Sequence, residues 1–395
     1  MADLTTVVGV GADGWEGLSR AARTAIEAAD VLMGSARQLA LIPSLDVVRV
    51  AWPSPLSEAL PGLLSQYSGR RICVLASGDP TFHGIGTTLV RMLGADAVQV
   101  IPHPSSVSLA CARLGWPQGQ VQVVSLVNKP VDRLHSHLQP GRQLLILSRG
   151  AQTPAEVAQL LNARGYGSSD FIVLEQLGGP GERVRRTRAS DWSDDVDALN
   201  VIAIDCRGPV LSTVPGLPDD AYENDGQLTK REVRAVTLSR LAPVPGQLLW
   251  DIGGGAGSIA IEWSRHHVSC RAIAVERDPD RVKRLERNAA SLGASVTVVQ
   301  GAAPAALDGL ESPDAVFIGG GATAAGMFDT CWDALKPGGR LVANGVTLET
   351  ESLIAQWYKS HGGDLVRLEV HRASPIGTMT GWRPAMPVTI WSVTK

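Results

Sequence analysis

The sequence predicts an α/β protein built from two domains, on three observations. The chain has 395 residues, which is long for one ordinary core and suits two domains of roughly 150 to 200 residues each. Short β-rich runs alternate with amphipathic stretches along most of the chain, a pattern typical of strands joined by crossover helices. The alternation breaks at 207–224, which gathers three prolines and two glycines. We therefore expect domains at 1–206 and 225–395, joined by a linker at 207–224.

The strands expected in the first half follow from its β-rich runs. These runs are 5–12, 70–80, 98–104, 120–126, 143–148, 171–178 and 199–206. Amphipathic stretches separate several of them, which predicts parallel strands with crossover helices. One helix start is legible, because Thr153 can cap, Pro154 suits the first helical position and Glu156 completes a capping box. That helix should run to about residue 163.

The second half shows the same alternation but does not repeat the sequence of the first half, so we expect a different α/β fold. Its expected strands are 247–253, 271–278, 296–301, 314–321 and 340–347. Thr229 and Glu232 form a second capping box, which predicts a helix that ends near Leu241. Two closing β-runs, 364–373 and 387–395, have no full helix between them. They are therefore expected to form an antiparallel pair at the sheet edge.

The composition argues against several classes of protein. With 36 basic and 39 acidic side chains the formal net charge is −3, so no polycationic field favours nucleic acid. No apolar run reaches the roughly 18 residues of a membrane helix, and residues 1–10 lack the pattern of a signal peptide. We expect a cytoplasmic enzyme that acts on a small molecule, forms a homo-oligomer, and has no membrane or nucleic-acid partner.

The cysteines and histidines predict no metal site. The five cysteines are scattered without CxxC spacing. Neither His135 with His137 nor His266 with His267 has further ligand-type residues at metal-site spacing. We expect buried, reduced thiols.

Residues 249–263 form an apolar strand, a glycine turn and a helix, the arrangement at which α/β sheets bind nucleotide-like ligands. Gly253, Gly255 and Gly257 allow a tight turn and a close approach of the backbone to a ligand. Glu276 ends the next strand, where its carboxylate can accept both hydroxyls of a ribose. The turn also fits the G-x-G-x-x-G/A fingerprint of dinucleotide enzymes, so an NAD-linked oxidoreductase stays open.

The context of this turn resembles class I methyltransferases. The resemblance lies in the D-x-G-x-G-x-G form led by Asp251, the phrase LKPGGRLV at 335–342 and the terminal β-pair. More narrowly, TKREVRA at 229–235 and FIGGGAT at 317–323 resemble the carbon-15 methylating and decarboxylating enzymes of corrin biosynthesis, over about 215–395. S-adenosylmethionine is then the implied methyl donor, contacted by Thr229, Gly253, Gly254, Gly255, Ala256, Gly257, Glu276 and Ala302. Ala256 stands where that family more often carries threonine.

Three loops of the first half resemble the tetrapyrrole methylase family, over about 1–205. They are GVGADG at 9–14, SGDPTFHGIG at 77–86 and PHPSSVSLACARLG at 102–115. The resemblance implies a fold of two α/β subdomains and a second methyl-donor site. The implied donor pocket is shaped by Gly9, Gly11, Gly78, Asp79, Pro80, Phe82, Ser105 and Ser106. Asp before Pro is also a common turn former, so a purely structural role for Asp79 stays open.

The order of the two halves resembles one bifunctional family of cobalamin (vitamin B12) biosynthesis, because LEQLGGPGERV at 174–184 resembles the branch that acts at carbon 5. That resemblance implies methylation of the tetrapyrrole precorrin-6Y at carbons 5 and 15. The ring C acetate would leave as carbon dioxide, and the product would be precorrin-8. One donor site in each domain and no metal cofactor are implied. A cobalt-containing substrate, an NAD-linked oxidoreductase and an RNA methyltransferase are the alternatives.

Charged side chains supply the remaining candidates. The run ERVRRTR at 182–188 holds four arginines, which suit either a solvated face or a site mouth that binds precorrin carboxylates. Decarboxylation is hypothesised to follow from holding the acetate in a poorly solvated place. Glu262 and Arg234 are the candidate catalytic residues for that step.

Overall fold

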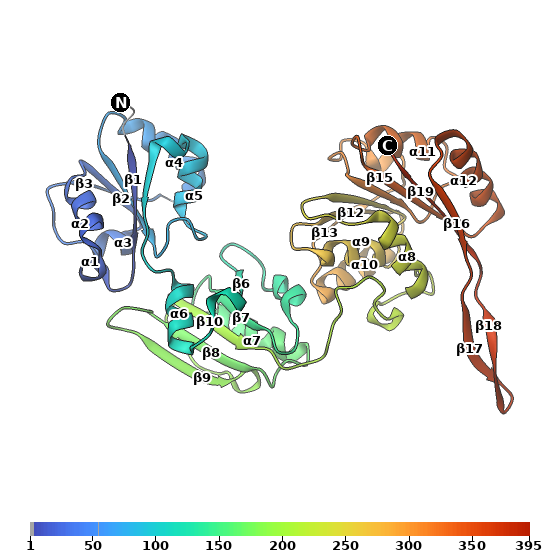
Figure 1. Ribbon diagram of the computed structural model, residues 1–395, viewed down its shortest axis with the longest axis horizontal. Helices are drawn as coiled ribbons and strands as arrows, with labels where there is room; N and C mark the ends of the chain where they lie inside the picture. The colour runs from blue at the N-terminus through green and yellow to red at the C-terminus, as the bar shows by residue number, and fades with distance from the viewer. Residues whose placement is uncertain (1–3, 54) are drawn as a thin grey trace. The chain divides into compact units, whose positions relative to one another are not determined.

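The computed structural model describes residues 4–53 and 55–395, which divide into two compact units (Figure 1). The first unit comprises the described parts of 1–131 together with 139–209, and the second comprises 132–138 and 210–395. Both are α/β folds built around sheets, so the predicted fold class is confirmed. Among the described residues, no helix combines the length and the apolar character needed to cross a membrane.

The first unit contains a five-stranded parallel sheet in the order β3-β2-β4-β1-β5. Its strands are β1 (Thr5–Val10), β2 (Val31–Gly34), β3 (Val48–Ala51), β4 (Ile72–Ser77) and β5 (Val98–Ile101). The accompanying helices are α1 (Gly14–Gly17), α2 (Arg20–Glu27), α3 (Ala36–Ala40), α4 (Leu56–Gln66) and α5 (Ile85–Leu93). Val7 and Val8 of β1 belong to two different buried clusters. Both faces of the sheet are therefore covered, which explains the continuous apolar runs of its central strands.

The second sheet of this unit is mixed, in the order β6-β7-β10-β8-β9. Its elements are β6 (Gln122–Ser125), β7 (Gln143–Leu147), β8 (Asp170–Glu175), β9 (Arg183–Arg188) and β10 (Asn200–Asp205), with α6 (Ser106–Leu114) and α7 (Thr153–Ala163). Only β6 and β7 pair in parallel, whereas β10 runs antiparallel to β7 and β8, and β8 runs antiparallel to β9. The expectation of parallel strands throughout is wrong here. The connection 176–182 between β8 and β9 is too short for a crossover and joins antiparallel neighbours.

The second unit is a seven-stranded sheet in the order β13-β12-β11-β14-β15-β19-β16. Its parallel strands are β11 (Leu248–Ile252), β12 (Arg271–Glu276), β13 (Val296–Gln300), β14 (Ala315–Ile318) and β15 (Arg340–Gly345). The helices are α8 (Arg231–Leu241), α9 (Ser258–His266), α10 (Pro279–Leu292), α11 (Met327–Ala334) and α12 (Leu348–His361). Side chains of α8, α9 and α10 pack in one buried cluster and those of α11 and α12 in another, which together sandwich the sheet.

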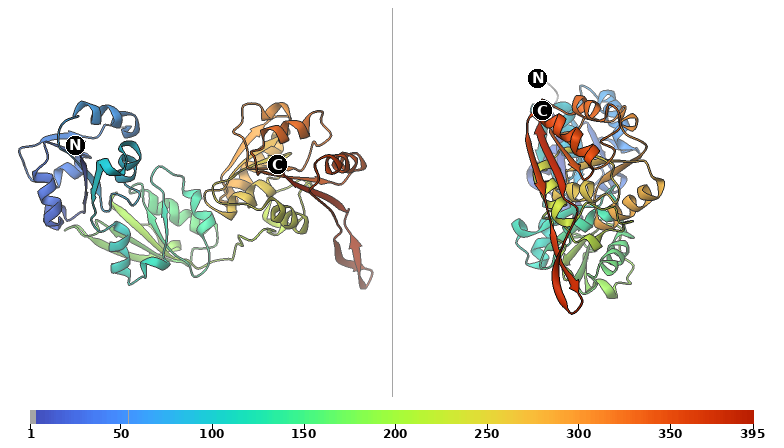
Figure 2. Two further views of the ribbon diagram at one scale, coloured as in Figure 1. Left: turned by 45° about the horizontal axis from the view of Figure 1, so that its top comes forward. Right: turned by 90° about the vertical axis from the view of Figure 1, so that its right-hand side faces the viewer.

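The antiparallel edge of this sheet is confirmed, and it carries an unpredicted hairpin. β16 (Asp364–Leu368) and β19 (Val388–Thr394) pair antiparallel, with β19 lying between β15 and β16. Between them, β17 (His371–Ile376) and β18 (Met379–Pro384) form a hairpin that extends away from the sheet of this unit (Figures 1 and 2). Met379 and Trp382 in the hairpin are 77% and 73% exposed. No periodic apolar face marks these strands, so the sequence patterning missed them.

The two predicted helices α7 and α8 are present, but neither predicted capping box is. α7 begins at Thr153 itself, and the Thr153 hydroxyl accepts a hydrogen bond from the Arg149 N–H at 3.2 Å instead. α8 begins after Lys230 without a side-chain cap. Both helices end at the expected residues, 163 and 241.

The second part of the segment predicted as a linker packs on the second unit. Leu217 and Tyr222 are 2% and 3% exposed and contact a cluster that includes Ile261 and Leu292. Residues 210–224 are irregular, as the prolines and glycines suggest, yet they belong to the second unit.

Candidate functional site

A cavity of about 1100 Å³ lies in the second unit at the carboxyl ends of β11, β12 and β14. Its wall includes the glycine turn after β11, Glu276 at the end of β12, and a second glycine turn, 319–321, after β14. These three strands are neighbours in the sheet, so the loops that follow them meet at one edge. Open α/β sheets bind their ligands at this edge, which makes the cavity the candidate site.

The glycines after β11 serve different purposes. Gly253, Gly255 and Gly257 adopt φ values of 75°, 56° and 81°, which residues other than glycine rarely adopt. A Cβ on Gly257 would lie 2.6 Å from the Leu285 side chain, and this glycine does not line the cavity. A Cβ on Gly255 would meet no atom closer than 3.7 Å. Gly257 therefore shapes the turn, whereas Gly255 borders open space where a ligand can approach the backbone.

Two carboxylates line the cavity beside this turn. Glu276 is 5% exposed and accepts hydrogen bonds from the N–H groups of Gly255 at 2.9 Å and Asp278 at 3.0 Å. Asp251 is 1% exposed and accepts a hydrogen bond from the Ala260 N–H at 3.0 Å. Burial raises the pKa of Asp251 to about 7; the Ala260 hydrogen bond opposes the rise and the charge of Glu276 adds to it. Glu276 orders the turn and stands at the strand end where a ribose is expected.

The remaining donor residues expected in this unit also line the cavity, namely Thr229, Gly253, Gly254, Ala256 and Ala302. Another part of the wall was not predicted. It includes Lys230, Arg372 and an apolar group formed by Val346, Leu368, Val370, Met386 and Val388. Lys230 lies within the TKREVRA motif beside Thr229 but was not singled out, whereas Arg372 and the apolar residues belong to no motif and reach the site only through the folding of the sheet edge.

Glu262 and Arg234 do not line the cavity and form a buried ion pair instead. They are 4% and 0% exposed, and Arg234 Nε lies 2.6 Å from Glu262 Oε1. Glu262 also accepts hydrogen bonds from Gly216 N–H at 2.5 Å, Leu217 N–H at 3.0 Å and the Tyr222 hydroxyl at 2.8 Å. Burial raises the pKa of Tyr222, as does the charge of Glu262, so this hydroxyl remains a donor. Glu262 accepts hydrogen bonds from four donors and does not line the cavity, which fits an anchoring role and does not favour the catalytic role for which it was a candidate.

The ion pair fastens a stretch that reaches the cavity wall. We call residues 216–230 the strap. Arg234 donates through Nη1 to the carbonyl of Thr229 at 2.5 Å and through Nη2 to the carbonyl of Leu217. Because one guanidinium holds both ends of the strap, it fixes where Thr229 meets the cavity.

Asn288 of α10 ties the strap to the glycine turn. It is 2% exposed, accepts a hydrogen bond from the Glu223 N–H at 2.9 Å, and donates to the carbonyls of Glu223 and Ala256, each at 2.9 Å. Three of the four hydrogen bonds that an amide side chain can make are thus used.

In the first unit, the three predicted loops follow the adjacent strands β4, β1 and β5. A Cβ on Gly9 would lie 2.1 Å from the carbonyl oxygen of Gly78 and 2.7 Å from the nitrogen of His103. Gly78 has a φ of 59°, and its Cβ would lie 3.2 Å from the Cα of Ser105. The loops therefore touch through their backbones at the carboxyl edge of the sheet, where a ligand site is expected.

The other predicted residues of these loops have identifiable local roles. Asp79 accepts hydrogen bonds from the N–H and the hydroxyl of Thr81 at 2.8 and 2.7 Å, the turn chemistry that the sequence left open. Pro80 sits against Gly86, whose Cβ would lie 2.7 Å from the Pro80 carbonyl oxygen. Ser105 caps α6, which begins at Ser106. Phe82 packs partly buried against the cluster under the second sheet.

Sequence reasoning missed a histidine and an aspartate at this edge. His103 Nε2 lies 3.4 Å from Asp13 Oδ1, and their side chains are 10% and 31% exposed. A Cβ on Gly11 would lie 2.5 Å from His103 Nε2. Gly11 is therefore needed because the imidazole lies against the loop. Asp13 lies within the first loop motif and His103 within the third, and these positions were the available signal.

The arginine run forms the edge strand β9. Arg183 and Arg185 pair with Glu175 at 2.8 and 3.1 Å, and Glu175 is completely buried. These two arginines thus balance a buried carboxylate, a role that was not among the expected ones.

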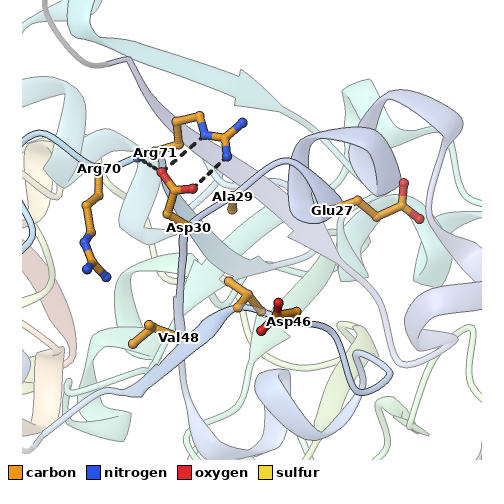
Figure 3. A pocket seen from close by; sticks show the side chains of 8 residues that line it. Glu27, Ala29, Asp30, Asp46, Val48, Arg70 and Arg71 are labelled. Atoms are coloured by element: carbon orange, nitrogen blue, oxygen red, sulfur yellow. Dashed lines mark hydrogen bonds and ion pairs between the residues drawn. The ribbon is translucent and has the colours of Figure 1, made fainter.

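A second hollow, of about 570 Å³, lies at the opposite edge of the five-stranded sheet (Figure 3). Asp30, Val48 and Arg71 in its wall lie at the amino ends of β2, β3 and β4. Arg71 pairs with Asp30 at 2.6 Å. Because ligands of parallel sheets bind at the carboxyl ends, this hollow is not a candidate donor site.

Two family models match the chain, one in each half. Residues 5–192 match the family described as Tetrapyrrole (Corrin/Porphyrin) Methylases, and residues 220–395 match the Precorrin methyltransferase domain. The chain is also 46% identical over 394 residues to the Precorrin-6Y C(5,15)-methyltransferase (decarboxylating) of Mycobacterium tuberculosis. That match covers 98% of this chain and 99% of the relative.

Two further relatives match only part of the chain. The Cobalt-precorrin-7 C(5)-methyltransferase of Salmonella typhimurium is 34% identical over 209 residues, which is 52% of this chain and 100% of the relative. The Probable cobalt-precorrin-6B C(15)-methyltransferase (decarboxylating) of Saccharolobus solfataricus is 35% identical over 144 residues, 35% of this chain and 72% of the relative. The match along 98% of the chain shows that the protein is a methyltransferase and not an NAD-linked oxidoreductase. The chain belongs to the precorrin-6Y C(5,15)-methyltransferase (decarboxylating) family, whose methyl donor is S-adenosylmethionine.

Proposed function

We propose that this chain methylates precorrin-6Y at carbons 5 and 15 and releases the ring C acetate as carbon dioxide, giving precorrin-8. The observation that carries the proposal is the match along 98% of the chain to a relative of that name. The metal-free substrate is preferred over a cobalt form, because the relatives with cobalt in their names match only 52% and 35% of the chain.

We further propose one donor site in each unit. In the second unit, open space at Gly255 and the carboxylate of Glu276 suit an adenosyl ligand, with Thr229, Gly253, Gly254, Ala256 and Ala302 around it. In the first unit, the proposed site lies at the meeting loops that carry Gly9, Gly11, Gly78 and Asp79. S-adenosylmethionine, when bound, supplies an electrophilic methyl group on its sulfonium.

The contribution of the chain to methyl transfer is alignment. Carbons of the reduced macrocycle are enamine-like nucleophiles, so holding one of them against the methyl group removes most of the entropic barrier. The apolar side of the cavity wall keeps the ring away from water. A poorly solvated acetate loses carbon dioxide more readily, since water no longer stabilises its charge, and the electron pair of the broken carbon–carbon bond passes into the ring system of the substrate.

We propose domains at 1–206 and 225–395, joined by a linker at 207–224. Because Leu217 and Tyr222 pack on the second unit, we expect the flexible part of this linker to lie before residue 217. Limited proteolysis tests this, with cleavage expected between about 207 and 215 and both products remaining folded.

We also propose that the chain forms a homo-oligomer. The hairpin β17–β18 exposes Ile376, Met379 and Trp382, and a two-stranded hairpin alone is only marginally stable in water. Sedimentation equilibrium measures the assembly, and a monomer across the accessible concentration range rules it out.

The central experiment incubates the purified chain with metal-free precorrin-6Y and a donor that carries an isotopically labelled methyl group. Mass spectrometry should find two labelled methyls in the tetrapyrrole and one released carbon dioxide. If no methyl is transferred, the substrate assignment is wrong. Calorimetric titration with S-adenosylhomocysteine counts the donor sites independently, and titration with NADH is the control.

A further inference from the structure

The cavity of the second unit extends beyond the residues expected to hold the donor. Its volume is about 1100 Å³, slightly above the range of about 300–1,000 Å³ for sites that hold one small ligand. The glycine turn and Glu276 form only part of its wall. Another part comes from the ends of β15 and β16, from β17, and from the start of β19. A second ligand beside the donor would therefore contact these residues of β15, β16, β17 and β19.

This second wall is apolar where it borders solvent. Val346 and Met386, which line it, are 49% and 68% exposed. Leu368, Val370 and Val388 continue the same surface along the base of the hairpin. Apolar surface in a concave site is complementary to a broad, conjugated ring system.

Two cations border the apolar wall. Lys230 lines the cavity and has no ion-pair partner among the described residues. Arg372 also lines it; its guanidinium pairs with Glu232 and lies 4.0 Å from Asp219. The side chains of Arg372 and Glu232 are 48% and 45% exposed, so water screens their attraction and its net contribution is small. Arg372 can therefore exchange its contact with Glu232 for a ligand carboxylate at a small cost in free energy.

We propose that Lys230, Arg372 and the apolar base of the β17–β18 hairpin form the acceptor subsite for the carbon-15 reaction. The subsite binds a tetrapyrrole through its ring and through acetate or propionate carboxylates. Lys230 stands two residues before Glu232, the partner of Arg372, so both cations lie at the same end of α8. This inference rests on the proposed function, since it assigns where the substrate of that function binds.

Hydrogen–deuterium exchange of the full chain with uroporphyrin, which carries acetate and propionate groups, tests the subsite without any methyl transfer. Protection is expected at 228–234 and 368–388. Lys230→Met and Arg372→Gln should each raise the uroporphyrin concentration needed for half-maximal protection about tenfold. This is the loss expected for one charge-assisted hydrogen bond. Arg271→Gln is the matched control, because it breaks an exposed ion pair with Glu311 at 2.7 Å outside the cavity. All three variants should bind S-adenosylhomocysteine like the unaltered chain.

Two outcomes overturn the subsite: no protection of these segments in the unaltered chain, or equal affinity for uroporphyrin in Lys230→Met, Arg372→Gln and the unaltered chain. Failure of the proposed function gives a different result, in which uroporphyrin protects these segments but precorrin-6Y gains no methyl. With precorrin-6Y, carbon dioxide release should show a KM raised about tenfold in both variants and a nearly unchanged kcat. A lowered kcat with an unchanged KM excludes a role in substrate binding.

Discussion

The side-chain amide of Asn288 donates a hydrogen bond to the carbonyl of Ala256 at 2.9 Å. The same amide accepts from the Glu223 N–H, so one buried side chain connects the strap with the glycine turn of the cavity. We therefore expect donor binding and the stability of the second unit to be coupled through this residue, which does not line the cavity.

Asn288→Ala should lower the free energy of unfolding of the second unit by about 3 kcal/mol, because it leaves buried backbone groups without partners. It should also weaken S-adenosylhomocysteine binding there, since the turn loses its connection to the strap. Urea unfolding and calorimetry measure the two effects. Ser291→Ala, on the same helix, removes only a hydroxyl that donates to the Asn288 carbonyl and serves as the control. Equal donor affinity in Asn288→Ala and the control contradicts the coupling.

Arg234→Met should destabilise the second unit by about 3–5 kcal/mol, because it leaves the buried carboxylate of Glu262 without its ion-pair partner. Glu262→Gln should have a smaller effect, since the amide oxygen can still accept from the strap. Differential scanning calorimetry of the full chain resolves the unit that melts early. Methylation at carbon 5 should persist in both variants. If Glu262→Gln kept full stability and donor affinity but released no carbon dioxide, a catalytic role for Glu262 would be restored.

Gly255→Ala and Gly257→Ala should separate ligand binding from folding. The alanine at 257 places its Cβ 2.6 Å from Leu285 and should lower the stability of the second unit by several kcal/mol. The alanine at 255 has space but a φ of 56°, so about 1 kcal/mol of strain is expected together with a larger loss of donor affinity. Thermal unfolding and S-adenosylhomocysteine titration compare the pair. The reverse ranking refutes the assignment of the two glycines.

Gly9→Ala should abolish methylation at carbon 5 and spare methylation at carbon 15. Its Cβ would lie 2.1 Å from the Gly78 carbonyl oxygen, so the loops of the first unit must separate. Mass spectrometry of the product distinguishes the two methylations. Gly62→Ala, in a position where a Cβ meets no atom within 4 Å, is the matched control. Loss of both methylations in a folded Gly9→Ala chain argues against independent sites.

Asp251 should give the stability of the second unit a distinct pH dependence. Its pKa is raised from 3.8 to about 7, so between these values the folded state keeps a proton that the unfolded state has lost. The contribution of this group to the free energy of unfolding therefore falls as pH rises through that window and is constant above it. Asp251→Asn removes the slope, so the variant should gain stability relative to the unaltered chain between about pH 4 and pH 7. Urea unfolding across that range measures the difference, and parallel profiles contradict the raised pKa.

Local signals were sufficient for much of the fold and for the proposed donor loops. The apolar runs predicted the strands of the second unit, because burial on both faces leaves a continuous hydrophobic signature. The positive φ angles of Gly253, Gly255 and Gly257 are local properties of one turn, and the glycines in the sequence predict them. Hairpin β17–β18 lacked such a signal, since its exposed strands bury no alternating face.

The sequence by itself determined the α/β class, the division into two dissimilar halves, and the loops that bear the proposed sites, because these depend on short-range patterns. Only the tertiary structure decided what the charged residues do. Glu262 and Arg234 looked like catalytic candidates, but their partners lie in the strap, and burial turns them into an anchor. Arg372 reaches Glu232 across 140 residues of chain. Contacts of that range arise from how a sheet edge folds back on a helix, which no local pattern encodes.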